Sequence, residues 1–342
     1  MRPFKAISKL TICFSIFGMG LWGQLYSQDV HFTQFDASPL SLNPANTGNF
    51  NGFWRFSANY RNQWRVLDYP FVSYSAGYER NLEDKNSPFS LGLYILHDES
   101  GIAELSYNKF IIPLAVAVGK EDNRISFGIQ PSYVNKRLNT SRLTFPNQYD
   151  PNTGLHDPSF ANGETIKNSI GFFDLHAGIA WQRVFNGKVL KMGVAGFHLT
   201  QPNESFTGNE FKTPIRKVAH VSFAFPVKER WVLMPKALVH EQTKASEYLF
   251  GNYSIHLLGP NAANVQSVFV GILGRFGINR NLDAMMAVLG VNYERWDFGI
   301  SYDINTSSLK SSTNGRGAVE LSVIFWNGKV RLNRTTIICE RF

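Results

Sequence analysis

The sequence has little of three things that would place it in common classes of protein: cysteine, charge and long apolar runs. Only two of its 342 residues are cysteine, which excludes a small fold held by several disulfide bonds. Charged residues make up 18% and aromatic residues 14%, which excludes an intrinsically disordered chain. Beyond the N-terminus no apolar run is long enough for a membrane-spanning helix. A soluble β-rich protein and a membrane β-barrel remain.

The first 27 residues are typical of a secretory signal peptide. Three basic residues precede a short, mostly apolar run at residues 10–22, and the small residue Ser27 follows. We expect cleavage after Ser27, so residues 1–27 would be removed and Cys339 would be the one remaining cysteine. The positive charges are spread along the chain, so they do not indicate nucleic-acid binding.

From residue 53 onward, apolar and polar residues alternate with the period of a β-strand. In the first segment Trp54, Phe56, Ala58 and Tyr60 alternate with polar residues. We predict fourteen such strands, at 53–61, 71–80, 88–97, 104–118, 124–136, 170–183, 189–199, 214–225, 230–240, 247–256, 265–276, 283–293, 295–304 and 317–326. Segments of about ten residues, with aromatic residues near their ends, are typical of outer-membrane barrels. A soluble β-sandwich remains the alternative.

We therefore predict an all-β fold, a transmembrane outer-membrane β-barrel of about 14 antiparallel strands over residues 53–326. Residues 28–52 show no alternation and would be an N-terminal segment that plugs the lumen or lies at its periplasmic mouth. Residues 327–342 would form a periplasmic C-terminal tail. The longest and most polar connection, 137–169, should lie outside the cell, because outer-membrane barrels have short periplasmic turns and longer outside loops.

The same orientation puts connections 62–70, 200–213 and 305–316 outside as well, and makes Asn186-Gly187 a tight periplasmic hairpin turn. Three prolines fall inside predicted strands, where proline cannot donate to a neighbouring strand. We expect bulges or shifted strand boundaries at Pro113, Pro131 and Pro235.

Two groups of residues are candidates for function. Alternation places six charged residues on the lumenal side, where opposite charges would pair or set selectivity: Arg55, Arg61, Lys236, Arg275, Asp303 and Glu320. Six residues at the outer ends of strands could form a partner-binding rim with Trp64 as its anchor, unless Trp64 belongs to the lipid-facing aromatic girdle: Gln63, Trp64, Gln201, Asn203, Tyr302 and Asp303.

The sequence contains no pattern that indicates a metal site or a catalytic site. Five histidines are expected to face the lumen from successive strands, at different heights: His176, His198, His220, His240 and His256. Ligands of one metal ion must lie at one height, so we expect no metal site. No nucleophile elbow, zinc-protease motif or phosphate-binding glycine loop occurs. We expect no cofactor and no enzymatic activity.

Short motifs in a fixed order carry a family resemblance. They are residues 28–35 (QDVHFTQF), 39–45 (PLSLNPA), 61–64 (RNQW), 198–203 (HLTQPN), Tyr302-Asp303 with Ser307, Ser308 and Leu309, residues 317–322 (GAVELS) and residues 339–342 (CERF). Together, from residue 28 to 342, they resemble the PorP/SprF family of outer-membrane proteins linked to type IX secretion and gliding motility. The sequence departs from the family at Glu340, where a proline is usual, and over 139–169, which matches little.

The resemblance implies a non-enzymatic barrel of the outer membrane that accompanies the type IX translocon. Its expected partners are secreted cargo proteins, such as adhesins with a C-terminal sorting domain, together with translocon and periplasmic ring components and outer-membrane lipid. It would help to export this cargo or to attach it at the cell surface. The alternative is a transport barrel for small solutes.

Overall fold

A computed structural model of the chain describes residues 29–327, apart from residues 83–87, 121, 151, 158, 161–162, 164, 244, 260–263, 278–281 and 308–309. The predicted signal peptide, residues 1–27, and the tail from residue 328 onward lie outside the described residues. Within the described part no helix is long and apolar enough to cross a membrane.

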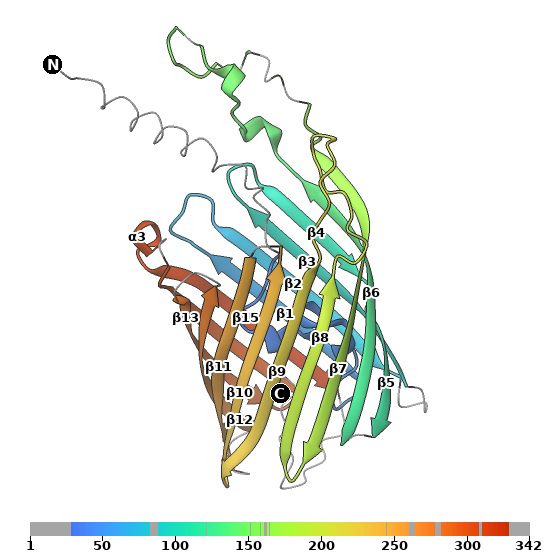
Figure 1. The fold of residues 1–342 in the computed structure, drawn as a ribbon. Helices are drawn as coiled ribbons and strands as arrows, with labels where there is room; N and C mark the ends of the chain where they lie inside the picture. The colour runs from blue at the N-terminus through green and yellow to red at the C-terminus, as the bar shows by residue number, and fades with distance from the viewer. Residues whose placement is uncertain are drawn as a thin grey trace, which may run out of the picture.

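The described strands form one antiparallel sheet that closes into a barrel (Figure 1). They are β1 (Trp54–Gln63), β2 (Phe71–Asn81), β3 (Phe89–Ser100), β4 (Leu105–Ile111), β5 (Leu114–Lys120), β6 (Asn123–Arg137), β7 (Ser169–Phe185), β8 (Lys188–Phe197), β9 (Arg216–Lys228), β10 (Trp231–Gln242), β11 (Ala245–Leu257), β12 (Val265–Gly277), β13 (Leu282–Tyr293), β14 (Trp296–Asn305) and β15 (Arg316–Asn327). The barrel closes because β1 pairs with both β2 and β15. Since β4 and β5 both pair with β3 and β6, they act as one interrupted strand. The prediction of about fourteen antiparallel strands is confirmed.

The barrel wall is apolar outside and largely polar inside. Along β1, Phe56 and Tyr60 are 37% and 40% exposed, whereas Arg55, Ser57 and Asn59 between them are buried. Water would not solvate a wall of exposed phenylalanine, leucine and isoleucine side chains, but hydrocarbon does. This inverted pattern excludes the soluble sandwich, whose alternation would bury the apolar set.

The prolines inside predicted strands explain the one interrupted strand. The break between β4 and β5 falls at Pro113, as predicted. Pro131, in β6, lies opposite this break, and its carbonyl accepts the Ile112 N–H. In β10 the pairing with β9 skips from Leu233 to Lys236, so Pro235 also sits where the ladder is interrupted. Each of these prolines, which have no backbone N–H to donate, therefore lies at or opposite an interruption in the hydrogen bonding between strands.

One end of the barrel carries the long connections. Residues 138–168 form the longest, with the short 3-10 helices η4 (Thr140–Arg142) and η5 (Pro146–Gln148), and it extends beyond the barrel in Figure 1. Connections 64–70, 198–215 and 306–315, the last with helix α3 (Lys310–Thr313), lie at this same end, as predicted from strand direction. We call this the long-loop end. At the other end Asn186 and Gly187 both have positive φ, as a two-residue hairpin turn requires.

The barrel interior is packed rather than open along the side formed by β8 to β13. Inward side chains there form an apolar cluster that includes Met234, Leu249, Tyr253 and Phe269. Two residues of the N-terminal segment join it, Phe35 in the short helix η1 (Phe35–Ala37) and Leu42 in α2 (Pro39–Leu42), and a third short helix, η2 (Pro44–Asn46), follows them. This segment passes through the lumen, and its contacts define the candidate site.

Candidate functional site

The N-terminal segment, residues 29–48, occupies the lumen along most of its length. Its side chains and backbone hydrogen-bond to several strands of the surrounding wall. The Leu40 carbonyl accepts from Gln130 Nε2 on β6 (2.9 Å), and the Gly48 N–H donates to Glu79 Oε2 on β2 (2.7 Å). We call residues 29–48 the lumenal segment.

Glycines on the wall let the lumenal segment approach closely. A Cβ atom added to Gly128 on β6 would overlap the Pro44 carbonyl, and one added to Gly178 on β7 would overlap the Asn43 side chain. Asn43 in turn donates from Nδ2 to the carbonyls of Ile179 (3.1 Å) and Val194 (3.3 Å). The wall and the segment are therefore fitted to each other at this position.

A buried charge network ties the segment to strands β1, β14 and β15. Arg61 contacts Asp303 Oδ2 at 2.9 Å and Glu320 Oε2 at 3.2 Å, and all three side chains are at most 3% exposed. Thr33 lies in the middle, accepting from Arg61 Nη1 (2.7 Å) and donating to Asp303 Oδ2 (2.9 Å). The backbone N–H groups of Thr33 and Gln34 each donate to Glu320 at 2.8 Å.

The remaining lumenal charges named from the sequence are also paired inside the barrel. Arg55 contacts Glu79 at 2.8 Å on neighbouring strands. Lys236 pairs with Asp36 of the lumenal segment at 2.9 Å, and its ammonium lies 3.2 Å from the centre of the Tyr253 ring. Arg275 joins the Arg61 network through Asp303 (3.5 Å) and Glu247 (3.2 Å). Such pairs leave few unpaired charges to attract an ion into the lumen.

A second polar cluster holds the start of the segment near the long-loop end. His198, just past β8, contacts Asp174 Oδ2 through Nδ1 (2.5 Å) and Asp29 Oδ2 through Nε2 (2.7 Å). Because carboxylates accept, both ring nitrogens donate. Burial would lower the pKa of His198, but Asp29 and Asp174 outweigh it and raise that pKa above 6.5. Burial would raise the pKa of Asp29, but His198 and Arg216 hold it well below 3.8.

The attachment of Asp29 should therefore depend on pH. The contribution of charged His198 is fully present below pH 6.5, its unfolded pKa, and is lost as the pH rises through its higher folded pKa. The contribution of Asp29 is lost only as the pH falls below 3.8. We expect the exchange protection of amides 29–33, corrected for intrinsic rate, to fall between pH 6 and pH 9. In a His198→Gln variant the protection of these amides should be low at both pH values. If the protection in the unchanged protein were the same at pH 6 and pH 9, this account would be contradicted.

The one serine–histidine contact in this cluster lacks the arrangement of a nucleophile and its base. His176 Nδ1 accepts from the His198 backbone N–H (3.0 Å), so Nε2 of the neutral ring carries the proton. Ser132 Oγ lies 3.3 Å from this Nε2. A general base needs a lone pair at that position, so His176 cannot take a proton from Ser132.

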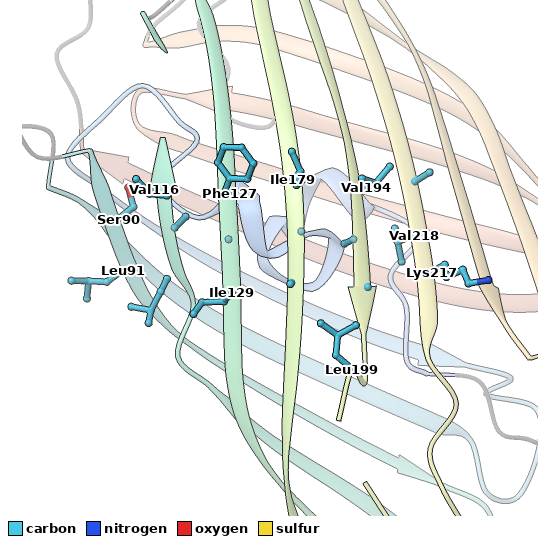
Figure 2. A pocket seen from close by; sticks show the side chains of 18 of the residues that line it. Ser90, Leu91, Val116, Phe127, Ile129, Ile179, Val194, Leu199, Lys217 and Val218 are labelled. Carbon is cyan, nitrogen blue, oxygen red and sulfur yellow. The ribbon is translucent and has the colours of Figure 1, made fainter. Parts of the chain in front are cut away.

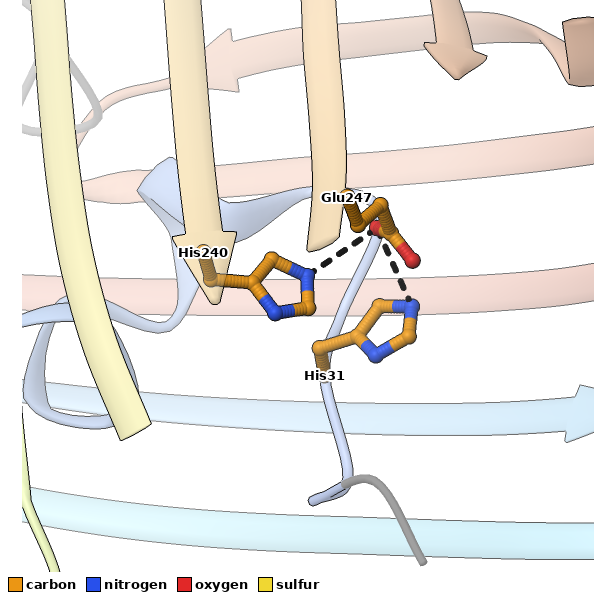
Figure 3. A group of neighbouring side chains, drawn as sticks. All are labelled: His31, His240 and Glu247. Atoms are coloured by element: carbon orange, nitrogen blue, oxygen red, sulfur yellow. Dashed lines mark ion pairs between the residues drawn. The ribbon is translucent and has the colours of Figure 1, made fainter. Parts of the chain in front are cut away.

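A third cluster joins the segment to β10 and β11. His31 Nε2 and His240 Nε2 both point at Glu247 Oε1, at 3.4 Å and 3.2 Å, as Figure 3 shows. Among the described residues, two groups of three side chains could hold a metal ion. One is this cluster of His31, His240 and Glu247, and the other is the group of Asp174, His176 and His198.

The structure corrects two of the histidine predictions. His256 faces outward, because it pairs across the strands with the exposed Trp231 and their rings lie 4.5 Å apart. Its strand, β11, buries Leu249, Tyr253 and Ile255 inside, so apolar residues occupy both faces and alternation alone misassigns the faces. His198 lies beyond the end of β8 rather than on it. The others face the lumen, and His220 Nε2 accepts from Asn43 Nδ2 (3.2 Å).

The six residues predicted for the rim are not brought onto one surface. Tyr302 is exposed on the outer wall, whereas the adjacent Asp303 is 1% exposed inside the barrel. Gln63 accepts from Arg61 (3.3 Å), and the Trp64 ring packs edge-on against Phe71, with centroids 5.0 Å apart.

The other two rim residues lie on connection 198–215. Gln201 is exposed with a positive φ, and its N–H donates to the His198 carbonyl (3.1 Å). Asn203 is exposed, and its side-chain oxygen accepts from the Ser205 and Phe211 N–H groups (3.2 and 3.0 Å), which shapes the connection. Gln63, Trp64, Gln201 and Asn203 therefore remain at the long-loop end.

The outer wall has an apolar groove of about 1240 Å³ across strands β3 to β10 (Figure 2). Ile129, Ile179 and Val194 border it, while small residues such as Ala177 and Ala219 hollow it. It opens on the membrane-facing surface, where acyl chains are the ordinary neighbours of apolar side chains.

Residues central to these clusters that were not named as candidates from the sequence include Asp29, His31, Asp174 and Glu247. The first two precede the strands, so alternation gave no face for them. Histidine and aspartate in the QDVHF motif were the available signal, but nothing in the linear sequence shows that they lie inside the barrel.

Comparison with known proteins gives one family match. A family model described as "Type IX secretion system membrane protein PorP/SprF" matches residues 24–325. Among curated proteins, no sequence matches significantly.

Solved structures share the fold at low sequence identity. The toluene transporter TbuX of Ralstonia pickettii has a TM-score of 0.50 at 8% identity, over 84% of this chain and 92% of its own. The monoaromatic hydrocarbon channel CymD has a TM-score of 0.49 at 11% identity, over 91% and 97%. The Pseudomonas putida toluene transporter TodX has a TM-score of 0.48 at 9% identity, over 88% and 98%. At 8% identity the likeness to TbuX concerns the fold alone.

Proposed function

Since the chain belongs to the PorP/SprF family of type IX secretion system membrane proteins, we propose that it binds particular exported proteins at its long-loop end and helps to export or anchor them. The protein is an outer-membrane β-barrel and a component of type IX secretion. The proposed cargo is an adhesin-like protein with a C-terminal sorting domain. Translocon and periplasmic ring components are its other proposed partners, and the proposed role requires no enzymatic step.

The filled lumen is the observation that carries this proposal. Residues 29–48 cross the interior and are held by paired charges at Arg61, Lys236 and Glu79. A barrel occupied in this way is suited to docking at its surface rather than to passing a solute. The alternative is transport of small solutes, as in the toluene transporter TbuX, which has a similar fold.

The connection 138–168 supplies a surface for docking. Three large side chains on it are exposed at the long-loop end, away from the barrel wall: Tyr149 (47%), Leu155 (69%) and Phe160 (47%). Apolar side chains on a polar loop in water are typical of binding surfaces. The family resemblance is weakest over this region, which suits a surface that selects one cargo.

We expect replacement of Tyr149, Leu155 and Phe160 by serine to reduce cargo binding by about 30-fold or more, the effect of losing an interface hot spot. Trp64→Ala tests the rim in the same assay. The measurement is the amount of sorting-domain protein retained at the cell surface, together with its affinity for the purified barrel. Val227→Ser, which alters an exposed apolar side chain near the opposite end of the barrel, at the end of β9, is the control. Unchanged retention in both test variants would contradict docking at this end.

A measurement of ion conductance distinguishes cargo docking from solute transport. In a planar bilayer the intact protein should show no steady open conductance, because the lumenal segment occupies the pathway. A steady conductance would overturn the docking account and favour transport.

A further inference from the structure

The cluster of His31, His240 and Glu247 brings three side chains from separate parts of the chain to one point (Figure 3). His31 belongs to the lumenal segment, His240 lies near the end of β10, and Glu247 lies near the start of β11. Their ligand atoms all lie within 4.8 Å of one another. His240 and Glu247 are 6% and 7% exposed, so both are more than nine-tenths buried.

The hydrogen bonding leaves this cluster incomplete. His31 Nδ1 lies 3.4 Å from the Asp29 carbonyl, which can only accept, so Nδ1 carries the proton of the neutral ring. The lone pair of Nε2 then points at Glu247 Oε1, which also carries only lone pairs. His31 Nε2, His240 Nε2 and Glu247 Oε1 all lack a hydrogen-bond partner. Glu247 Oε1 is nevertheless paired in charge with Arg275 Nε at 3.2 Å, so the positions left without an aligned hydrogen bond are those of the two histidine nitrogens.

The spacing of these atoms suits a tetrahedral metal ion. Zinc binds imidazole nitrogen at about 2.0–2.1 Å and carboxylate oxygen at about 2.0–2.2 Å, which separates adjacent ligands by roughly 3.3 Å. The distances from Glu247 Oε1 to His31 Nε2 and His240 Nε2 are 3.4 Å and 3.2 Å. A hydrogen bond from Nδ1 to a backbone carbonyl, as at His31, is also the usual partner of a metal-bound histidine.

The other candidate group does not share this feature. Both ring nitrogens of His198 donate to carboxylates, Asp174 and Asp29, so His198 has no lone pair for an ion. His176 Nδ1 is occupied by the His198 N–H. That group is complete without a metal ion, whereas the group around Glu247 is not.

We propose that His31 Nε2, His240 Nε2 and Glu247 Oε1 bind a divalent transition-metal ion of the zinc class, which fastens the lumenal segment to β10 and β11. A water molecule would complete a tetrahedral set of two histidines and one glutamate. The site lies toward the long-loop end, and the His31 side chain is 22% exposed, which provides a route of entry.

The surrounding charges admit a cation. The connected network contains one more carboxylate than guanidinium groups, with the carboxylates on Glu247, Asp303 and Glu320 and the guanidinium groups on Arg61 and Arg275. Arg275 Nε lies 3.2 Å from Glu247 Oε1, and its Nη2 contacts both Asp303 and Thr33, so its charge is shared with other acceptors.

Metal binding by the purified full chain in detergent tests this site. After removal of metal with a chelator and its dialysis, zinc chloride is added and bound zinc is measured by mass spectrometry and calorimetry. We expect one zinc ion per chain. His31→Gln and His240→Gln should each weaken binding at least 10-fold, since loss of even an outer hydrogen-bond partner of a ligand costs about 10- to 100-fold. Cobalt chloride should give the visible absorption of a tetrahedral ion, and each variant should lose it.

Two controls make the result decisive. His256→Gln removes a histidine that faces outward and should bind zinc as the unchanged protein does. His31 lies on the lumenal segment rather than on a strand, so His31→Gln leaves the barrel able to fold, which its mobility in unheated detergent gels verifies. No saturable zinc binding, or the same affinity in His31→Gln and in the unchanged chain, would overturn the proposal.

Discussion

Replacing Arg61 by methionine is expected to destabilise the barrel by about 3–5 kcal/mol, the cost of breaking a buried ion pair by removing one partner. The substitution leaves Asp303 and Glu320 facing each other inside the barrel, with only Thr33, Gln34 and the more distant Arg275 to compensate. The measurement is urea unfolding of the protein in lipid vesicles, followed by tryptophan fluorescence.

Arg137→Met is the matched control, because Arg137 is exposed at the end of β6 and its side chain donates to the half-buried Asn135 rather than to a carboxylate. It should change the free energy of unfolding by no more than about 0.5 kcal/mol. If Arg61→Met were no worse than Arg137→Met, the network would not be a major contributor to the stability of the barrel.

Replacing Phe35 by alanine should release the lumenal segment, with a loss of about 3–5 kcal/mol, as for other buried phenylalanines. Phe35 is 5% exposed, belongs to the large apolar cluster inside the barrel, and lies beneath the Lys236 ammonium at 5.3 Å. Hydrogen exchange of amides 29–48 measures the effect, which should be large there and small in the strands.

Phe53→Ala is the control for this substitution, since Phe53 is 38% exposed and lies between the lumenal segment and β1. It should leave the protection of amides 29–48 nearly unchanged. The prediction would be contradicted if Phe35→Ala reduced the exchange protection of the strand amides as much as that of amides 29–48. The segment and the barrel would then unfold as one unit.

Alternation predicted the wall well because it is a local property. Each strand must present apolar side chains to lipid, so the pattern in segments such as Trp54 to Tyr60 appears directly in the sequence. The loss of alternation before residue 53, and the length of connection 138–168, were equally visible. The break at Pro113 was predicted because proline lacks an N–H.

Alternation was less informative where the interior is itself apolar. In β11, Leu249, Tyr253 and Ile255 face inward and Phe250 faces outward, so neither face is distinguished by hydropathy. His256 was therefore placed on the wrong side. Tyr302 and Asp303 were wrongly grouped as one rim motif for a different reason: they are neighbours in a strand and so point to opposite faces, as the clean alternation of β14 shows.

The sequence by itself determined the strand count, the direction of the strands, the lumenal position of charges such as Arg61 and Glu320, and the family. Only the tertiary structure decided what those charges meet. Closing the barrel brings Thr33, His31 and Asp29 within hydrogen-bonding distance of residues 169 to 287 positions away along the chain. Such contacts depend on where the lumenal segment runs inside the barrel. This segment has no periodic pattern, and the composition of the chain, with its low charge and few cysteines, does not indicate its path. The ion pairs that hold the lumen filled are therefore a property of the closed barrel.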